Sequence, residues 1–317
     1  MNQVSVPTKR LKPLSQKESL SKSILKNGAL YFMILPGFLY FVIFKYLPMF
    51  GLVIAFQDYK PYQGILGSRW VGLAHFERLF AEPMFLNILV NTLVLFFMNL
   101  IFFFPVPIIL ALMLNEVRQQ AFKRVIQTMV YIPHFMSWVI IVSISFVMLS
   151  MDRGLVNELL VAGGFEKVNF LLNPDWFRPT YILQIIWREA GWGTIIYLAA
   201  MASIDPQLYE ASRIDGAGRF RQIWHITLPS IRSVIVILLL LKIGDVLEVG
   251  FEHIFLLLNA MNREVGEVFD TYVYLAGLQQ GQFSYSAAVG FFKSFVGLAL
   301  VVTANWLSKK FGEEGIY

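Results

Sequence analysis

Six long apolar runs constrain this chain more than any other feature of its sequence. They cover roughly residues 29–56, 86–114, 125–150, 180–203, 229–250 and 286–307. A helix needs about 20 mainly apolar residues to cross the roughly 30 Å of hydrocarbon in a bilayer, and each run is long enough. The runs therefore predict an all-α membrane protein with six transmembrane helices. Pro36, Pro48, Pro105 and Pro107 lie within the first two runs and predict kinks there.

The composition favours a membrane protein over a soluble one. Hydrophobic residues make up 57% of the 317 residues, charged residues make up 15%, and the mean hydropathy is +0.61. A soluble domain of this length would need more charged surface, so most of the chain is expected to face lipid. The basic pI near 9.3 could indicate a nucleic-acid partner, but the basic residues lie mainly in tails and loops. That distribution is typical of membrane topology, and we expect no nucleic-acid partner.

The distribution of lysine and arginine predicts how the chain is oriented. The N-terminal tail, the C-terminal end and two of the loops carry fifteen of these residues, and the remaining connections carry seven. Because cytoplasmic segments are enriched in Lys and Arg, both termini are expected in the cytoplasm, and the connections 57–85, 151–179 and 251–285 outside. The predicted organisation is a cytoplasmic tail over 1–28, a transmembrane domain over 29–307 and a cytoplasmic tail over 308–317.

The stretch 205–229 is too polar to lie in lipid and has a helical pattern. Asp205 is suited to cap a helix that begins at Pro206, because the first helical position needs no amide donor. Gly216 lies where that helix would end with a positive φ, and Gly218 precedes a second short helix. The sequence therefore predicts two short helices at a right-angle bend, held at the membrane surface and offered to a partner.

This stretch resembles the cytoplasmic loop of permeases of ABC importers. The family pattern is Glu-Ala-Ala, three residues, Gly, nine residues and Ile-x-Leu-Pro, and here serine replaces the second alanine. The matching residues are Glu210, Ala211, Ser212, Gly216, Ile226, Leu228 and Pro229. The resemblance implies the type I ABC importer permease fold, in which this loop forms coupling helices that dock into a cleft of the ATPase subunit. A bare interfacial helix-turn-helix is the alternative that the spaced motif disfavours.

The last third of the chain extends the resemblance. From Lys242 onward, including DTYVYLAGLQQGQFSYSAAVGFFKS, it is similar to carbohydrate-importer permeases of the oligo- and polysaccharide branch, above all those of alginate-oligosaccharide importers. This similarity implies a permease for oligosaccharides, including acidic ones such as alginate, in the bacterial inner membrane. It also implies a second permease in a heterodimer, two ATPase subunits that use ATP and Mg, and an extracytoplasmic solute-binding protein. Neutral oligosaccharides and phosphorylated polyols are the alternative substrates.

Ionisable residues within the apolar runs are candidates for the substrate path, because charges at membrane depth usually face the bundle interior or water. Neighbouring aromatic rings suit sugars, whose apolar faces stack on rings while their hydroxyls bind polar groups. Lys242, Asp245 and Glu248 are expected to share one side of the fifth helix through their three-residue spacing. The candidates are Trp187, Arg188, Glu189, Trp192, Lys242, Asp245, Glu248 and Lys293. Ion pairs that hold helices in register are the alternative role.

The chain is expected to be no enzyme and to hold no metal or cofactor of its own. It contains no G-x-x-x-x-G-K-[ST] motif for nucleotide phosphates, no G-x-S-x-G motif and no cysteine. Its four histidines lie in different segments, so no zinc-site spacing occurs. An ion-coupled secondary transporter, with Glu189, Asp245 and Glu248 as cation sites, is the alternative from another class. An intramembrane enzyme is disfavoured, because the sequence offers no paired nucleophile and base.

Overall fold

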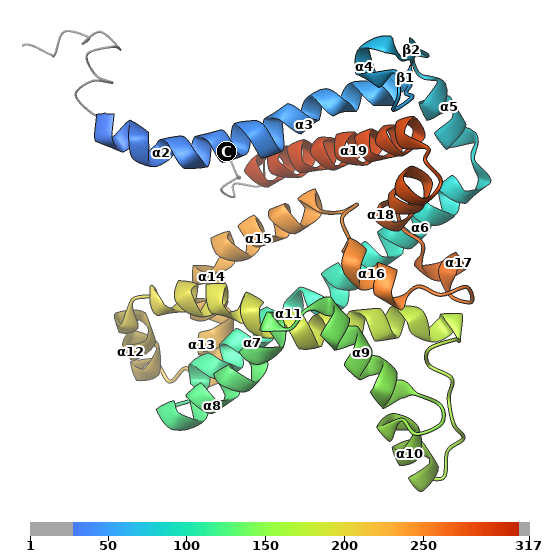
Figure 1. Cartoon of the computed structure of the whole chain (residues 1–317). Helices are drawn as coiled ribbons and strands as arrows, with labels where there is room; N and C mark the ends of the chain where they lie inside the picture. The colour runs from blue at the N-terminus through green and yellow to red at the C-terminus, as the bar shows by residue number, and fades with distance from the viewer. Residues whose placement is uncertain (1–27, 311–317) are drawn as a thin grey trace, which may run out of the picture. The chain divides into compact units, whose positions relative to one another are not determined.

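The computed structural model describes residues 28–310 and is predominantly helical (Figure 1). The chain divides into two compact units, residues 1–53 and 54–317. The predicted cytoplasmic tails, 1–28 and 308–317, lie largely outside the described residues. The helical run of the first unit begins with α2 (Gly28–Phe41), the π-helical turn η1 (Val42–Tyr46) and α3 (Leu47–Met49), and the 3-10 helix η2 (Phe50–Phe56) continues it.

The second unit begins with a small segment of mixed structure. Strand β1 (Gln57–Asp58) pairs antiparallel with β2 (Arg69–Trp70), with Gln57 opposite Trp70. Helix α4 (Gly64–Gly67) lies in the connection, and α5 (Ala74–Ala81) follows. Phe56 stacks on Trp70 at a centroid distance of 5.7 Å and contacts Phe76 at 5.4 Å, so aromatic rings hold the two strands against α5.

The remaining helices form the body of the second unit. Those before and including the central helix are α6 (Pro83–Met98), η3 (Asn99–Phe103), α7 (Pro105–Glu116), α8 (Gln120–Tyr131), η4 (Ile132–Phe135), α9 (Trp138–Leu149), α10 (Leu155–Ala162), η5 (Pro174–Trp176) and α11 (Phe177–Ala202). Those after it are α12 (Pro206–Ile214), α13 (Arg219–Gln222), η6 (Ile223–Thr227), α14 (Leu228–Ser230), α15 (Arg232–Gly244), α16 (Phe251–Leu257), α17 (Arg263–Gly266), α18 (Phe269–Tyr274), η7 (Leu275–Gln279) and α19 (Phe283–Lys310). Helix α11 crosses the middle of this unit and packs against α7, α8 and α17 (Figure 1).

The predicted membrane spans correspond to helices of sufficient length. Among the described residues, three uninterrupted runs are long and apolar enough to cross a bilayer, namely Gly28–Phe56, Pro83–Glu116 and Phe283–Lys310. Two bent pairs would each make one further crossing, Gln120–Phe135 with Trp138–Leu149 and Arg219–Ser230 with Arg232–Gly244. Helix α11 has 26 residues and reaches about 39 Å, which is enough for a sixth crossing despite its internal charges.

The third and fifth predicted spans are not single straight helices. The third bends by 104° between η4 and α9, where Pro133 lies in the last turn of the first part. Ser137 then caps α9 through its side-chain oxygen, which accepts from the amide of Ile140. The fifth ends at Gly244 rather than near 250, and the chain is non-helical until Gly250, whose φ of 97° suits glycine alone.

Three prolines within the helical runs lie just after π-helical turns. In the run Pro83–Glu116, η3 lies just before Pro105, and the amide of Phe104 donates to the carbonyl oxygen of Asn99 five residues earlier. Proline lacks an N–H donor and crowds the preceding turn, and a widened turn relieves this crowding. In the same way, the π-helical turn η1 lies just before Pro48, and the π-helical turn η6 lies just before Pro229.

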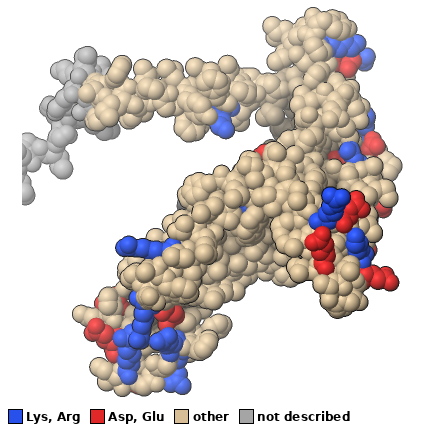
Figure 2. Space-filling model, turned by 60° about the horizontal axis from the view of Figure 1, so that its bottom comes forward, with Lys and Arg blue, Asp and Glu red and all other residues tan. Residues whose placement is uncertain are grey.

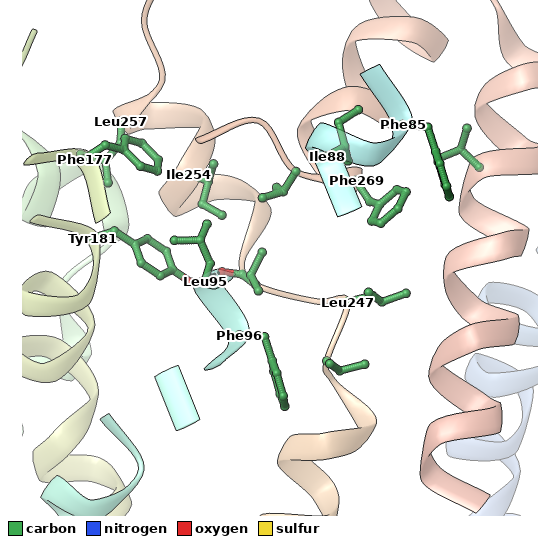
Figure 3. Close-up of a cluster of buried hydrophobic side chains, with 14 of the residues drawn as sticks. Phe85, Ile88, Leu95, Phe96, Phe177, Tyr181, Leu247, Ile254, Leu257 and Phe269 are labelled. Atoms are coloured by element: carbon green, nitrogen blue, oxygen red, sulfur yellow. Dashed lines mark hydrogen bonds between the residues drawn. The ribbon is translucent and has the colours of Figure 1, made fainter. Parts of the chain in front are cut away.

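The hydrophobic core of the second unit joins α6 and α11 to the segment after α15. Figure 3 shows Phe177 and Tyr181 of α11 beside Ile254 and Leu257 of α16, with Phe85 and Ile88 of α6 near Phe269 of α18. His253, Glu267 and Val268 are fully buried as well. The segment 251–285, predicted as an external connection, thus folds into short helices that complete the core.

Candidate functional site

A cavity of about 340 Å³ lies in the second unit between α11, the α6–η3 segment and the connection from α15 to α16. Its walls combine aromatic rings with amide, hydroxyl and charged groups. They are formed by Phe96, Asn99, Phe103, Trp138, Tyr181, Ile185, Glu189, Trp192, Gly193, Lys242, Asp245, Glu248, Val249 and Gly250. This combination suits a ligand that has both apolar faces and hydroxyl or carboxylate groups.

Helix α11 supplies one wall of the cavity through its regular spacing. Tyr181, Ile185, Glu189 and Trp192 follow one another at intervals of four, four and three residues, so they share one face of the helix. Glu189 lies in the middle of this face, and His134 Nδ1 lies 2.9 Å from its Oε2 atom. Glu189 and Trp192, both predicted as substrate-path residues, thus line the same cavity.

The non-helical segment after α15 supplies the opposite wall. Lys242, Asp245 and Glu248 all line the cavity, but the expected reason is wrong. Helix α15 ends at Gly244, so Glu248 is no helical neighbour of Lys242. A turn brings it there instead, in which the Glu248 amide donates to the Asp245 carbonyl oxygen at 2.8 Å.

Three of the predicted path residues do not line this cavity. Trp187 lies on another side of α11, where it borders an apolar groove with Leu183, since a step of one residue turns a helix by about 100°. Arg188 is engaged with the protein itself. Lys293 of α19 forms ion pairs with Asp270 of α18 and, at 3.6 Å, with Glu248. Lys293 therefore neutralises the cavity residue Glu248 without lining the cavity itself.

Sequence reasoning missed several neutral groups in the cavity. Tyr181 is completely buried, and its Oη atom donates to the carbonyl oxygen of Val249 and accepts from Asn99 Nδ2. His253 lies behind this wall, with its Nε2 atom 2.6 Å from Gln184 Oε1. Unlike the charged candidates, these residues do not stand out in the sequence. The only indication of their role was that each is a single polar residue within an apolar run. Their contacts are made across segments distant in the chain.

The predicted helical loop at 205–229 is confirmed in its local structure. Asp205 caps α12 by accepting from the amide of Gln207 at 2.9 Å, and Pro206 is the first helical residue. Gly216 ends the helix with a φ of 75°, and α13 begins after Gly218. The loop backbone therefore follows the capping rules that its sequence indicated.

Side-chain contacts tie the two parts of this loop together. The Gln222 side chain donates to Ser212 Oγ at 2.9 Å, and Tyr209 Oη lies 2.9 Å from Thr227 Oγ1. Serine at the position where the family pattern has alanine thus provides an acceptor to α13. Arg219 forms a 3.8 Å ion pair with Glu116 at the end of α7, which connects the loop to the second helical run.

The loop presents a surface suited to another protein. A second cavity of about 460 Å³ is lined by α7, α12 and α13 and includes Glu210, Arg213 and Arg219. Ala211 beside Glu210 is exposed, and so are Ile214, Phe220 and Trp224. Figure 2 shows charged side chains at this end of the second unit, at lower left, and a wide uncharged surface next to it. An exposed apolar patch with charges beside it is typical of an interaction site.

The end of the motif anchors the loop to the body of the unit. Ile226 lies in η6, and Leu228 and Pro229 lie in α14. Ile226 and Leu228 are half-buried, and Leu228 packs against a small core around Ile231, Tyr197 and Met201. The described residues contain no group of three or more His, Cys, Asp or Glu side chains that could hold a metal ion.

The comparisons with known proteins agree on one class. The family model described as binding-protein-dependent transport system inner membrane component matches residues 103–312. The polygalacturonan/rhamnogalacturonan transport system permease protein YteP of Bacillus subtilis (strain 168) is 68% identical over 302 residues, which are 95% of this chain and 94% of that protein. Protein LplB of the same strain is 51% identical over 316 residues, 99% of each chain.

A solved structure gives the same result for the fold. One chain in the crystal structure of a bacterial alginate ABC transporter, in complex with an alginate pentasaccharide-bound periplasmic protein, matches with a TM-score of 0.87 and 42% sequence identity. The match covers 94% of this chain and 99% of that one. The two chains therefore share one overall fold.

Proposed function

This chain belongs to the family of binding-protein-dependent transport system inner membrane components, and from that premise we propose that it is a permease subunit that admits acidic oligosaccharides. The substrate class is one whose sugars carry carboxylates, of the galacturonate type. The single observation that carries this proposal is the cavity beside α11, which places aromatic rings and Lys242 on facing walls.

The charges around the cavity support a carboxylated substrate. Glu189 is paired with Arg188 and His134, and Glu248 is paired with Lys293. In the described part of the chain, Lys242 forms no salt bridge, and its Nζ atom lies 5.9 Å from the centre of the Phe103 ring. Asp245 lines the same cavity, and its charge acts on Lys242 without a direct ion pair. Lys242 is the cation among the cavity-lining residues, so it is the group that would form a charge-assisted hydrogen bond with a substrate carboxylate.

The relatives support the same substrate class. The names of the similar proteins include a polygalacturonan/rhamnogalacturonan system at 68% identity, and a second solved transporter, 43% identical, imports the acidic polysaccharide alginate. Both polymers contain uronic acids. The higher identity favours galacturonate-containing chains over the alginate expected from the sequence. A neutral substrate is the alternative, since an arabinooligosaccharide permease is 29% identical.

The substrate class can be tested with the assembled transporter. The complex is reconstituted in nanodiscs with its binding protein, and ATP hydrolysis is measured with oligogalacturonates, alginate oligosaccharides and arabino-oligosaccharides of matched length. We expect the strongest stimulation with oligogalacturonates. Equal or greater stimulation by the neutral arabino-oligosaccharides would contradict the proposal. Lys242→Gln should lower the uptake of charged more than of neutral oligosaccharides, which tests the cavity directly.

The loop around Glu210 is proposed to couple transport to ATP. Two ATPase subunits, which hold ATP and Mg, would dock on this loop in the cytoplasm, and a second permease and an extracytoplasmic binding protein would complete the importer. The exposed apolar residues of α12 and η6 and the charges of Glu210 and Arg213 are the supporting features. The family assignment argues against the ion-coupled alternative, in which Glu189, Asp245 and Glu248 would bind cations.

A charge reversal tests the docking role. Glu210 is exposed on α12, where a lone carboxylate contributes little to stability. Glu210→Lys should leave the amount of permease in the membrane unchanged and lower the hydrolysis stimulated by loaded binding protein, because it alters the charge that the ATPase meets. Asp152→Lys, a reversal at an exposed site on a different segment, is the control. Unchanged assembly and stimulation for Glu210→Lys would contradict the coupling role.

A further inference from the structure

Arg188 and Glu189 are consecutive residues of α11 that both engage the third helical run. The guanidinium group of Arg188 forms an ion pair with the carboxylate of Glu189. Arg188 Nε also donates to the carbonyl oxygen of Met136 at 2.9 Å. Met136 lies between η4 and α9, at the 104° bend of the run. The pair therefore lies at the one place where the third run changes direction.

On the α9 side of this bend, Arg188 holds Trp138. The guanidinium carbon lies 4.5 Å from the centre of the Trp138 ring, as in a cation–π contact. The other face of Trp138 stacks on His253 at a centroid distance of 3.8 Å and an interplanar angle of 8°. His253 in turn stacks on Tyr181. Trp138 thus contacts both Arg188 and a buried histidine, and it also lines the cavity.

On the η4 side of the bend, Glu189 holds Trp192 through His134. The imidazole of His134 lies 2.9 Å from the Glu189 carboxylate and stacks on Trp192 with a centroid distance of 4.4 Å and an interplanar angle of 4°. Trp192 also borders the cavity. The two consecutive residues thus each control one tryptophan, one on either side of the bend.

We propose that Arg188 and Glu189 are positioning residues, which hold the side chains of Trp138 and Trp192 in the lining of the cavity and so set how well an oligosaccharide passes through it. This inference rests on the proposed function, because it assigns the rings to sugar contact. Arg188 acts here through Trp138 and does not bind the substrate carboxylate, since its guanidinium is engaged by Met136, Glu189 and Trp138. Lys242 keeps that role.

The arrangement explains why an ion pair is present at this depth. A charged pair is costly in a membrane protein interior unless its remaining donors and acceptors find partners. Here the guanidinium and carboxylate groups find them in the backbone of the bend and in His134. The same contacts fix the orientation of two large rings that line the cavity. Lysine in place of Arg188 would keep the charge but lose the flat face and the multiple donors.

The test uses conservative variants in the assembled transporter. Arg188→Lys and Glu189→Gln are combined with Trp138→Leu and Trp192→Leu in double-mutant cycles, with Trp187→Phe as the control on the same helix. Oligosaccharide uptake and stimulated ATP hydrolysis are both measured per assembled complex. We expect Arg188→Lys to lower uptake about threefold to tenfold, the range for losing a partly desolvated cation–π contact. Hydrolysis should fall less, because the coupling loop is intact.

The cycles identify how each residue acts. In the Trp138→Leu background, Arg188→Lys should lower uptake little further, and Glu189→Gln should behave likewise with Trp192→Leu. Matched pairs should be more strongly coupled than the crossed pairs. Two results would overturn the proposal: effects that multiply independently in the matched pairs, or variants whose uptake per assembled complex equals that of the parent. If a variant lowers only the amount of assembled complex, its uptake per complex still equals that of the parent. The residue then has a role in stability alone, and the proposal is overturned.

The two proposals fail in different ways. If the parent complex imports no oligosaccharide, the proposed function is wrong. If the parent imports the oligosaccharide and the conservative variants match it per assembled complex, the positioning role alone is wrong.

Discussion

The phenolic oxygen of Tyr181 donates a 2.6 Å hydrogen bond to the main-chain carbonyl oxygen of Val249. This bond joins the N-terminal part of α11 to the non-helical segment between α15 and α16. Asn99 Nδ2 donates to the same phenolic oxygen at 3.0 Å, so two helical runs and the non-helical segment meet at one atom. The bond fixes the backbone of the cavity wall, because residues 245–250 have no helical hydrogen-bond ladder to hold them.

Replacing this tyrosine should destabilise the second unit. Tyr181→Phe removes the donor to Val249 and the acceptor for Asn99, both of which are buried. Leaving buried polar groups without partners costs about 1–3 kcal/mol. We expect a lower midpoint of thermal unfolding for the purified complex in detergent. Tyr62→Phe, at a side chain that is 80% exposed, is the control and should leave the midpoint unchanged. Equal midpoints for both variants would show that these bonds contribute no net stability.

The conformation of Gly216 leads to a prediction about coupling. Its φ is 75°, and a Cβ atom added there would meet no other atom within 4 Å. The cost of a side chain is therefore backbone strain, roughly 1–2 kcal/mol and higher for a β-branched residue. Gly216→Val should reposition α13 and reduce stimulated ATP hydrolysis while the abundance of the permease is maintained. Gly218→Val should have a much smaller effect, because Gly218 has a φ of −72° and equal space. Similar losses in both variants would point away from the backbone conformation as the cause.

The crossing of α11 and α8 depends on the absence of a side chain at Gly191. A Cβ atom at this position would lie 1.9 Å from the carbonyl oxygen of Val130. Such close backbone approach is typical of small residues between membrane helices. Gly191→Ala should separate the two helices, at a cost of about 1–3 kcal/mol or more, and lower the amount of assembled complex.

A matched substitution separates this packing effect from helix propensity. Gly290 lies within α19, and a Cβ atom there would meet nothing within 4 Å. Gly290→Ala should leave the complex unchanged or raise its stability by roughly 0.5–1 kcal/mol, because alanine favours a helix interior. Assembly is measured by size-exclusion chromatography from equal amounts of membrane. Normal assembly of Gly191→Ala would contradict the close crossing.

The membrane helices could be predicted from the sequence because their signal is a long apolar run, which depends on composition alone. The bend in the third run was not predicted, although Pro133 and Ser137 indicated an end and a start within it. An apolar run carries no information on direction, so its continuity was overestimated. The helix of the fifth run ends earlier than predicted for a similar reason. Gly244 and Gly250 lie at the end of α15 and the start of α16, but their sequence positions alone did not indicate a break.

The candidate site could be predicted only where a charge stands out against apolar surroundings. Glu189, Lys242 and Asp245 were found in this way and do line the cavity. Arg188 has the same signal but faces the protein, and the sequence alone could not distinguish the two cases. Tyr181 and Asn99 were missed because a neutral residue in an apolar run has no distinguishing pattern. Their roles come from contacts across 82 residues of sequence.

The most direct test of the central claim is uptake by the purified assembly. The permease pair, the ATPase subunits and the binding protein are reconstituted in liposomes, and the entry of labelled oligogalacturonate is followed with and without enclosed ATP. We predict uptake that requires ATP and the loaded binding protein, persists when an uncoupler abolishes ion gradients, and falls when Lys242 is replaced by glutamine. Uptake that proceeds without ATP and collapses with the uncoupler would contradict the account.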